Sequence, residues 1–554
     1  MSASSKKKLR KEQNAALLTE KQQKAQAEAK KMKITTIVFV AVVLAIVVTF
    51  AAVLIVNTVK NSGVSQKHTI AATVDGVEIN SVEFNYYYSD LLSNTYNQWY
   101  SSYGDSMSTY MSLMGLDLTK PLDEQTYSLG EEEDVTWADY FVESALERAK
   151  SDYTLYNAAV AAGHELTEDE QASYDSTLLN LTFYAQLYGY NNVNQYLRGM
   201  YGPGANEKSY NEYCMRSALA SSYYTAYNDS LVYSETELDA YAADKLTNYN
   251  SYDYAYYYVN YTKFLKDGTK DDKGEVTYTD EQHAAARAEA KAAAQSLLKA
   301  KTPEELDAAV GALSFNAGST VTANKSVNTL GTSVSSIYGE WLTNPGRQVN
   351  DIAMFAYDTV STDADGKETT SVNGYYVVMF QGVSDNARPL GNVRHLLVKF
   401  EGGTKGENNE TVYTAKEKEA AKTKAEGYLQ TWKDGEATEE SFIELVKANS
   451  QDSSASTGGL FEDITPTSSY VTNFLNWSID VNRQKGDTEV IETEYGYHVM
   501  YYVGASELNY RDYMIAADKR SEDLTAWYES LIKDVTGTIG DLEYIDTSKI
   551  LSAE

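Results

Sequence analysis

The sequence predicts an α+β protein with a transmembrane helix near its start, a helical domain, and two tandem copies of a module of strands and helices. Three observations predict this class. An uncharged apolar run fills residues 34–56, helical spacing continues from about 136 to 248, and several phrases return farther along at constant offsets. A chain of 554 residues is also too long for one core, so three or four domains are expected.

The start of the chain divides into a basic tail, an apolar run and a short polar linker at 57–68. Residues 1–33 contain ten Lys or Arg and three acidic residues, a net charge of +7. Ile34–Val56 is 23 residues without a charge, enough to cross a hydrocarbon core of about 30 Å. We expect an uncleaved single-pass signal anchor in the cell membrane. By the positive-inside rule, its N-terminus is cytoplasmic and the bulk of the chain is extracellular.

The charge and cysteine content limit the partners and the chemistry of the exterior part. The whole chain carries −32, so the residues after the tail carry −32 − 7 = −39. Phosphate binding needs basic clusters, so no nucleic acid partner is expected. Cys214 is the single cysteine, which excludes an internal disulfide. The 47 tyrosines fit either compositional drift in a secreted protein or a surface that handles peptides.

Residues 69–251 are expected to form the helical domain. Asp75-Gly76 predicts a hairpin turn, and Asn80 or Ser81 can cap the helix that follows it. Helical spacing then covers about 136–162, 167–188, 206–230 and 235–248. The final segment, 506–554, is helical in pattern again at 509–535. We expect this C-terminal helix to return to the helical domain, with 506–540 forming part of it.

Two stretches read as copies of one module, residues 252–388 and 389–505. Strand-like runs at 254–264 and 390–400 both end in Lys-Phe. Each is followed by a charged loop, a capping box and an Ala/Lys/Glu-rich helix, at offsets of 135 or 136 residues. The runs 371–380 and 493–502 correspond at an offset of 122. Constant offsets with one deletion indicate a tandem duplication.

The second copy places two histidines at strand positions among apolar neighbours, His395 and His498. Asp452 lies in a loop rich in Ser and Gly, and Thr493 precedes His498 by five residues. One imidazole that donates and one that accepts, together with a hydroxyl, can form a rigid buried network. A metal site on the two histidines and Asp452 is disfavoured, because they follow no compact ligand spacing. No cofactor is expected.

Four phrases of the second copy resemble the parvulin peptidyl-prolyl isomerases in order and spacing. They are "RHLLVKF", "FIELVKANSQDSSASTGG", "NFLNWSIDVNRQKGD" and "ETEYGYHVMYYV", within residues 392–503. The PrsA-like and SurA-like extracytoplasmic foldases are the most similar members, since the opening "ATVDGVEINSVEF" is also similar to theirs. The resemblance implies an antiparallel sheet with flanking helices in each module, and a helical chaperone domain.

The resemblance also implies the site residues. His395 and His498 would be the catalytic histidine pair, Asp452 would face the prolyl peptide bond, and Thr493 would hydrogen-bond the pair. Phe474, Tyr470 and Leu460 would line the substrate pocket for the proline ring. The chain departs from the family pattern Gly-Gly-Asp-Leu-Gly at "GGLFED", residues 458–463.

The first copy lacks these groups. In the sequence alignment, Val259, Tyr376 and Ser371 stand opposite His395, His498 and Thr493, and Asp452 has no counterpart. We therefore expect residues 252–388 to be an inactive parvulin-like domain, either a spacer or a peptide-binding domain.

These expectations describe a membrane-anchored isomerase and chaperone for newly secreted, unfolded polypeptides containing X-Pro bonds. The reaction needs no covalent change, since the enzyme has only to bind the twisted amide better than the planar forms. A holdase chaperone without isomerase activity is the alternative, because residues 458–463 depart from the pattern. A structural surface protein or adhesin is a third reading, which would require regular repeats and binding features that the sequence does not show.

Overall fold

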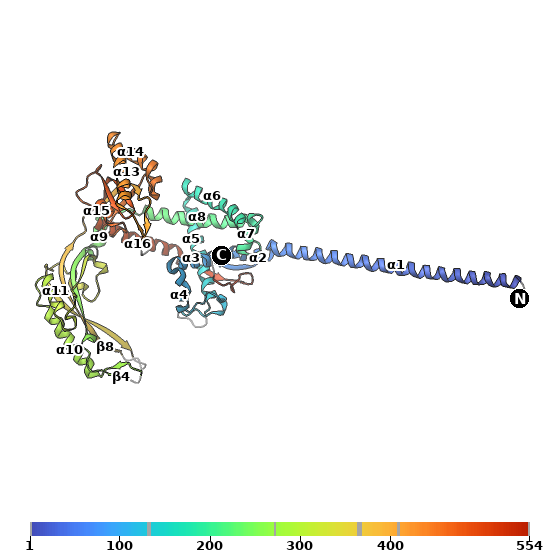
Figure 1. Ribbon diagram of the computed structural model, residues 1–554, viewed down its shortest axis with the longest axis horizontal. Helices are drawn as coiled ribbons and strands as arrows, with labels where there is room; N and C mark the ends of the chain where they lie inside the picture. The colour runs from blue at the N-terminus through green and yellow to red at the C-terminus, as the bar shows by residue number, and fades with distance from the viewer. Residues whose placement is uncertain (1–2, 130–134, 271–272, 363–367, 407–409, 552–554) are drawn as a thin grey trace. The chain divides into compact units, whose positions relative to one another are not determined.

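The computed structural model describes residues 3–129, 135–270, 273–362, 368–406 and 410–551 (Figure 1). The predicted segments 1–33, 69–251, 252–388, 389–505 and 506–554 each include a few residues outside this description. Helices and strands are mixed along the chain, which confirms the predicted class at that level. The chain divides into two compact units. Residues 1–231 with 524–554 form the helical unit, and residues 232–523 form the sheet unit.

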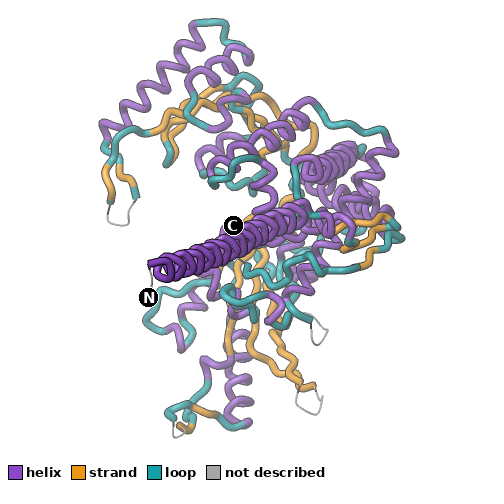
Figure 2. Tube along the Cα trace, turned by 90° about the vertical axis from the view of Figure 1, so that its right-hand side faces the viewer, coloured by secondary structure: helices purple, strands orange, loops and turns teal. Residues whose placement is uncertain are grey.

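The chain begins with one long helix, α1 (Ala3–Ser62), which is continuous in both views (Figures 1 and 2). Among the described residues, Lys30–Val53 is the one stretch of helix long and apolar enough to cross a membrane. The segment predicted as a linker is helical, since α1 continues to Ser62 and α2 (Val64–His68) follows. Gly63 between them packs closely on Gly204, because a Cβ at Gly63 would lie 2.1 Å from the Gly204 Cα.

The helical unit begins with a hairpin of β1 (Ile70–Val74) and β2 (Val77–Asn80). Asp75 and Gly76 form its turn with positive φ angles of 48° and 78°, as the sequence predicts. The Asn80 side chain caps the next helix by accepting hydrogen bonds from the backbone N–H groups of Val82 and Glu83. The helices that follow are α3 (Ser81–Tyr103), α4 (Met107–Leu113), α5 (Trp137–Ala162), α6 (Glu168–Leu187), α7 (Val193–Tyr201) and α8 (Glu207–Ser230).

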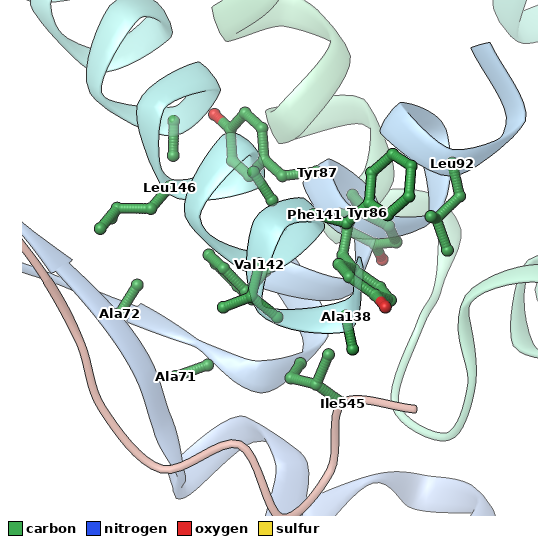
Figure 3. Packing of buried hydrophobic residues seen from close by; sticks show 14 of the residues in the cluster. Ala71, Ala72, Tyr86, Tyr87, Leu92, Ala138, Phe141, Val142, Leu146 and Ile545 are labelled. Carbon is green, nitrogen blue, oxygen red and sulfur yellow. The ribbon is translucent and has the colours of Figure 1, made fainter. Parts of the chain in front are cut away.

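The end of the chain completes this unit. The helix α16 (Tyr510–Ile532) crosses the division between the units at residue 524, and β15 (Gly537–Ile539) then pairs antiparallel with β1. The core lies between the hairpin, α3 and α5, and Figure 3 shows Ala72, Tyr87 and Phe141 packed there with Ile545 from the chain's end. Burial of these apolar side chains stabilises the unit and holds the distant chain end in place.

One predicted boundary differs from the structure. The sequence assigns residues up to 251 to the helical domain, but α9 (Glu235–Ala242) belongs to the sheet unit. Leu238 and Ala242 pack against Ile515 and Ala516 on the first half of α16, so their apolar surface is buried there.

In its described residues, the sheet unit contains two four-stranded antiparallel sheets. In the first module the elements are β3 (Ser251–Asn260), α10 (Asp280–Leu297), α11 (Pro303–Gly311), β6 (Asn324–Leu330), α12 (Gly339–Leu342), β7 (Ile352–Thr362) and β8 (Glu368–Ser384). In the second they are β9 (Pro389–Lys399), α13 (Ala415–Asp434), α14 (Glu439–Asn449), β12 (Leu460–Ile464), α15 (Thr472–Ser478), β13 (Thr488–Thr493) and β14 (Gly496–Asn509). Their strand orders, β6-β3-β8-β7 and β12-β9-β14-β13, are the same arrangement. A short hairpin accompanies each module, β4 (Thr269–Lys270) with β5 (Val276–Thr277), and β10 (Thr404–Lys405) with β11 (Thr411–Val412).

Local sequence signals explain where the module helices begin. The two predicted capping boxes form, with Thr279 and Gln282 at α10 and Thr414 and Glu417 at α13. In each, the threonine accepts a hydrogen bond from the N3 backbone and the N3 side chain bonds the threonine N–H.

A further correspondence between the modules was not predicted. Arg347 lies over the Trp341 ring at 4.6 Å, and Arg483 lies over the Trp477 ring at 4.3 Å. The backbone hydrogen bonds that follow also match. In the first module the Asn350 N–H donates to the Phe380 carbonyl, and the Phe380 N–H donates to the Asp351 carbonyl. In the second module Gly486, Tyr502 and Asp487 form the same two bonds. The two modules therefore share strand order, helix caps and this arginine–tryptophan contact.

Candidate active site

The two predicted histidines lie on adjacent central strands of the second module. His395 on β9 is opposite Met500, and His498 on β14 is opposite Leu397. Residues two positions apart share a face, so the histidines are diagonal neighbours on one side of the sheet. Their Nδ1 atoms are 2.9 Å apart, and the side chains are buried, 2% and 5% exposed.

Thr493 and Asp452 lie at the two ends of this pair. Thr493 Oγ1 is 2.9 Å from His498 Nε2, and Asp452 Oδ1 is 3.5 Å from His395 Nε2. Thr493 ends β13, the strand beside β14, which explains its approach to His498. The structure therefore brings together the four residues that the sequence identifies as catalytic candidates.

Backbone pairing along β9 positions the loop that contains Asp452. The N–H of Gln451 donates to the Leu397 carbonyl at 3.0 Å, and the Leu397 N–H donates to Ser450 Oγ at 3.1 Å. These two bonds attach the loop to the edge of β9 that continues past its pairing with β12. Asp452 is therefore held next to His395.

Sequence reasoning missed Ser454, which connects the carboxylate to the imidazole. Its hydroxyl donates to Asp452 Oδ1 at 2.6 Å and lies 3.4 Å from His395 Nε2. Its backbone N–H also donates to Asp452 Oδ1, at 2.9 Å. The spacing Asp-x-Ser is typical of a capping turn and was the signal available in the sequence.

The electrostatics of the site favour a neutral His498 and an ionised Asp452. Burial, reinforced by the neighbouring His395, lowers the pKa of His498 from 6.5 to about 3. The hydrogen bond with His395 is the main cause that holds the pKa of Asp452 below its ordinary value. A carboxylate favours a proton on the His395 Nε2 that faces it. His395 Nδ1 then accepts from His498, and His498 Nε2 accepts from the Thr493 hydroxyl.

This electrostatic pattern predicts a pH-dependent loss of local stability. A lowered histidine pKa stabilises the folded form above pH 6.5, and this contribution is lost as the pH falls toward 3. Between pH 6.5 and about 4.5, the opening free energy of β14 should fall by ~2–3 kcal/mol. Hydrogen exchange of the β14 amides, corrected for intrinsic rates, measures it. Asp452 stays ionised in this window because its pKa is lowered. An unchanged pH dependence in His498→Gln would contradict the assignment.

Aromatic rings cover the histidine face. Phe474 is 3% exposed, and its ring lies 5.3 Å from His395 and 5.7 Å from His498. Tyr470, 38% exposed, stands 5.3 Å from Phe474 at the edge of the cluster. Both therefore belong to one cluster of aromatic rings beside the histidines.

The structure does not bring Leu460 to the histidines. Leu460 pairs with Arg394, while the next residue, Phe461, pairs with Val393. Opposite residues share a face, so Phe461 lies on the histidine side and Leu460 on the other. The Phe461 ring is 5.1 Å from His395 and 5.7 Å from Phe474. Sequence reasoning missed Phe461, because the departure at "GGLFED" left the register of this strand undetermined.

We expect Phe461→Ala to raise KM for a prolyl peptide about tenfold, because it removes one ring of the wall without emptying a fully buried core position. Leu460→Ala is the matched control, since it is adjacent in sequence and lies on the opposite face. Steady-state kinetics on both variants measure the difference. A larger effect for Leu460→Ala would show that the register is misassigned.

The register of the first module corrects the sequence alignment. Tyr357 pairs with Gly374 as Thr493 pairs with Gly496, so Tyr357, not Ser371, takes the threonine position. In the same register Tyr256 occupies the position of His395, three residues before the Val259 of the alignment. Val259 is buried in the cluster that packs on the helices.

Three tyrosines replace the imidazoles and the phenylalanine on that face. Tyr256 corresponds to His395, Tyr376 to His498, and Tyr338 lies 6.4 Å and 5.7 Å from their rings. Phe474 lies at comparable distances from the two histidines. The described residues on this face of the first module include no imidazole, so the hydrogen-bonded pair is missing there.

Comparison with known proteins identifies the second module. Residues 395–504 match the family model described as Rotamase, PPIC-type PPIASE domain. Similar solved structures include the PPIase domain of TBPAR42, at 21% identity over 20% of this chain and 98% of that chain, with a TM-score of 0.17. PrsA from Bacillus cereus is 19% identical over 30% of this chain and 57% of that one, with a TM-score of 0.17. PrsA from Bacillus subtilis is 12% identical over 76% and 96%, with a TM-score of 0.24.

No curated protein matches the chain. The structural similarities are too low to support an argument, so the assignment rests on the family model and on the site geometry. The matched range contains the histidine pair, Asp452 and the aromatic wall. Residues 395–504 of this chain are therefore a parvulin-type peptidyl-prolyl cis-trans isomerase domain.

Proposed function

We propose that this protein is a membrane-anchored, extracytoplasmic isomerase and chaperone for newly exported polypeptides that contain X-Pro bonds. The observation behind the isomerase site is the His395–His498 contact of 2.9 Å beneath three aromatic rings. The apolar segment Lys30–Val53 and the basic residues before it support the anchor and its orientation.

The proposed site lowers the barrier by distinguishing a twisted amide from a planar one. Rotation about a peptide bond faces ~18–20 kcal/mol because it removes resonance. Phe461, Tyr470 and Phe474 would hold the proline ring while the preceding carbonyl rotates. The planar amide has more negative charge on its oxygen than the twisted one does. The Asp452 carboxylate nearby would therefore disfavour the planar form.

The histidine pair would keep the walls of this site rigid. The two imidazoles contact each other, and each also contacts one further group, Asp452 for His395 and Thr493 for His498. These contacts restrict the side-chain conformations of the four residues. No nucleophilic attack is proposed, because the reaction changes no covalent bond.

We propose that the first module is a degenerate copy of the parvulin-like domain. Its matching strand order, caps and arginine–tryptophan contact support a duplication, and the tyrosines at the histidine positions support the loss of activity. Asn316 lies 136 residues before Asp452, which is the offset between the two modules, so it takes the sequence position of Asp452 in the first module. Its side-chain amide donates to the Tyr257 hydroxyl and the Val310 carbonyl.

A proline-limited refolding assay with the full chain separates this function from the holdase alternative. We expect the wild-type chain to accelerate the slow refolding phase and also to suppress aggregation of a denatured protein. A His395→Ala variant should lose the acceleration and keep the suppression. A wild-type chain that suppresses aggregation without accelerating the slow refolding phase would support the holdase instead.

A further inference from the structure

One cavity lies within the helical unit, whereas the isomerase site belongs to the sheet unit. The cavity volume is about 610 Å³, and residues of α3, α5, α6 and α8 line it. A cavity of this size is in the range that holds a small ligand or a few residues of a peptide.

Neutral hydrogen-bonding groups make up much of the lining. They include Asn94 and Gln98 on α3, Ser173 and Thr177 on α6, and Ser221 and Thr225 on α8. Hydroxyls and amides both donate and accept, so they can pair with the N–H and C=O groups of an extended backbone whatever its sequence. Such a lining suits a polypeptide better than a purely apolar ligand.

Aromatic side chains supply the apolar part. Tyr87, Tyr174, Tyr210 and Tyr213 line the cavity together with Leu91. Tyr87 and Tyr213 are nearly buried and stand edge to face at 4.9 Å, so their position is set by packing. This surface can receive an apolar side chain without rearrangement of the helices.

The ionisable lining is acidic. Asp90 accepts hydrogen bonds from the hydroxyls of Tyr201 at 2.7 Å and Tyr213 at 2.9 Å, and Glu170 accepts from Ser222 at 3.0 Å. The lining residue Arg148 contacts the buried Asp152 at 3.2 Å, so an acid already offsets its charge. The field in the cavity therefore favours a cationic side chain over an anionic one.

We propose that this cavity binds extended segments of unfolded polypeptide in which Lys or Arg alternates with apolar residues. The inference rests on the proposed chaperone function and gives it a location and a preferred client chemistry. Backbone pairing provides tolerance of sequence, the tyrosines hold the apolar side chain, and Asp90 and Glu170 attract the cation.

The test measures binding of a proline-free peptide, Gly-Lys-Tyr-Lys-Leu-Ser-Gly, so that the isomerase site is not involved. The full chain in lipid nanodiscs is titrated against the fluorescent peptide and against its counterpart with Glu in place of both Lys. We expect the Lys peptide to bind about tenfold more tightly.

Two variants fill the cavity from two different helices, α6 and α8. Ser221 and Thr177 are exposed at its lining, so Ser221→Trp and Thr177→Trp occupy it without disturbing the core. Each should weaken binding of the Lys peptide about tenfold or more. Ser176→Trp is the matched control on α6, exposed and outside the lining, and it should bind as the wild type does.

Equal binding by the filled variants and Ser176→Trp would overturn the proposal, and so would absence of binding by the wild type. Aggregation suppression separates this result from the proposed function. If the wild type suppresses aggregation and both filled variants do so equally well, the cavity is excluded while the chaperone function stands. If the wild type does not suppress aggregation, the chaperone function itself fails.

Discussion

Asp452→Asn is expected to lower kcat/KM for a prolyl peptide about 100-fold, on the scale of removing one electrostatic group from an active site. The substitution removes the charge that faces His395 Nε2 at 3.5 Å. Asn retains an acceptor for the Ser454 N–H and is itself a good capping residue, so the loop should keep its conformation. The unfolding free energy should therefore stay within about 0.5 kcal/mol of wild type.

Kinetics and chemical denaturation of the same preparations measure these two effects. Glu462→Gln is the control, because Glu462 is an exposed acid on the strand that follows the loop. It should change neither quantity. An Asp452→Asn enzyme with normal kcat/KM would show that the carboxylate serves only as a cap.

Phe474→Ala should destabilise the second module by about 3–5 kcal/mol, the range for emptying a buried phenylalanine site. The ring is 3% exposed and contacts both histidines and the aromatic wall. Its loss would leave a cavity beside the imidazole pair and remove one ring of the wall that we propose for the proline ring. Hydrogen exchange across β9 and β14 reports the stability, and kinetics under native conditions report the activity.

Tyr470→Ala gives the matched comparison. Tyr470 belongs to the same cluster but is 38% exposed, so its truncation leaves no closed cavity. We expect a stability change of less than about 1 kcal/mol with a clear rise in KM. Equal destabilisation by both variants would contradict the placement of Phe474 as the buried ring.

The sequence predicted what depends on short-range signals. The capping boxes at Thr279 and Thr414 form as expected, because cap and N3 residue meet within one helical turn. The four polar residues of the site also meet, because they follow the order and spacing of a family that the chain resembles.

Register was not predictable in the same way. The Lys-Phe landmark used to align the modules ends strand β9, at Lys399, but in the first module it falls in a 3₁₀ turn after β3 ends at Asn260. This shift of three residues placed Val259 opposite His395 where the structure has Tyr256. A similar ambiguity concealed Phe461, since a one-residue change in register moves a side chain to the other face.

Residues 57–68 are helical where the sequence predicts a linker, because amino-acid composition does not indicate tertiary packing. Residues 57–68 are polar and short, which is typical of a connection between domains. Gly63, however, allows its backbone to approach Gly204, and Gln66 is buried, so the segment belongs to the folded unit.

The central claim is that prolyl isomerisation occurs at the imidazole pair of the second module and not at the tyrosines of the first. Exchange NMR of a cis–trans prolyl peptide with the full chain tests it most directly. The wild type and Tyr256→Ala/Tyr376→Ala should both accelerate exchange, and His395→Ala/His498→Ala should leave it at the uncatalysed rate. Loss of acceleration in the tyrosine variant with retention in the histidine variant would contradict the account, as would a wild-type chain that does not accelerate exchange.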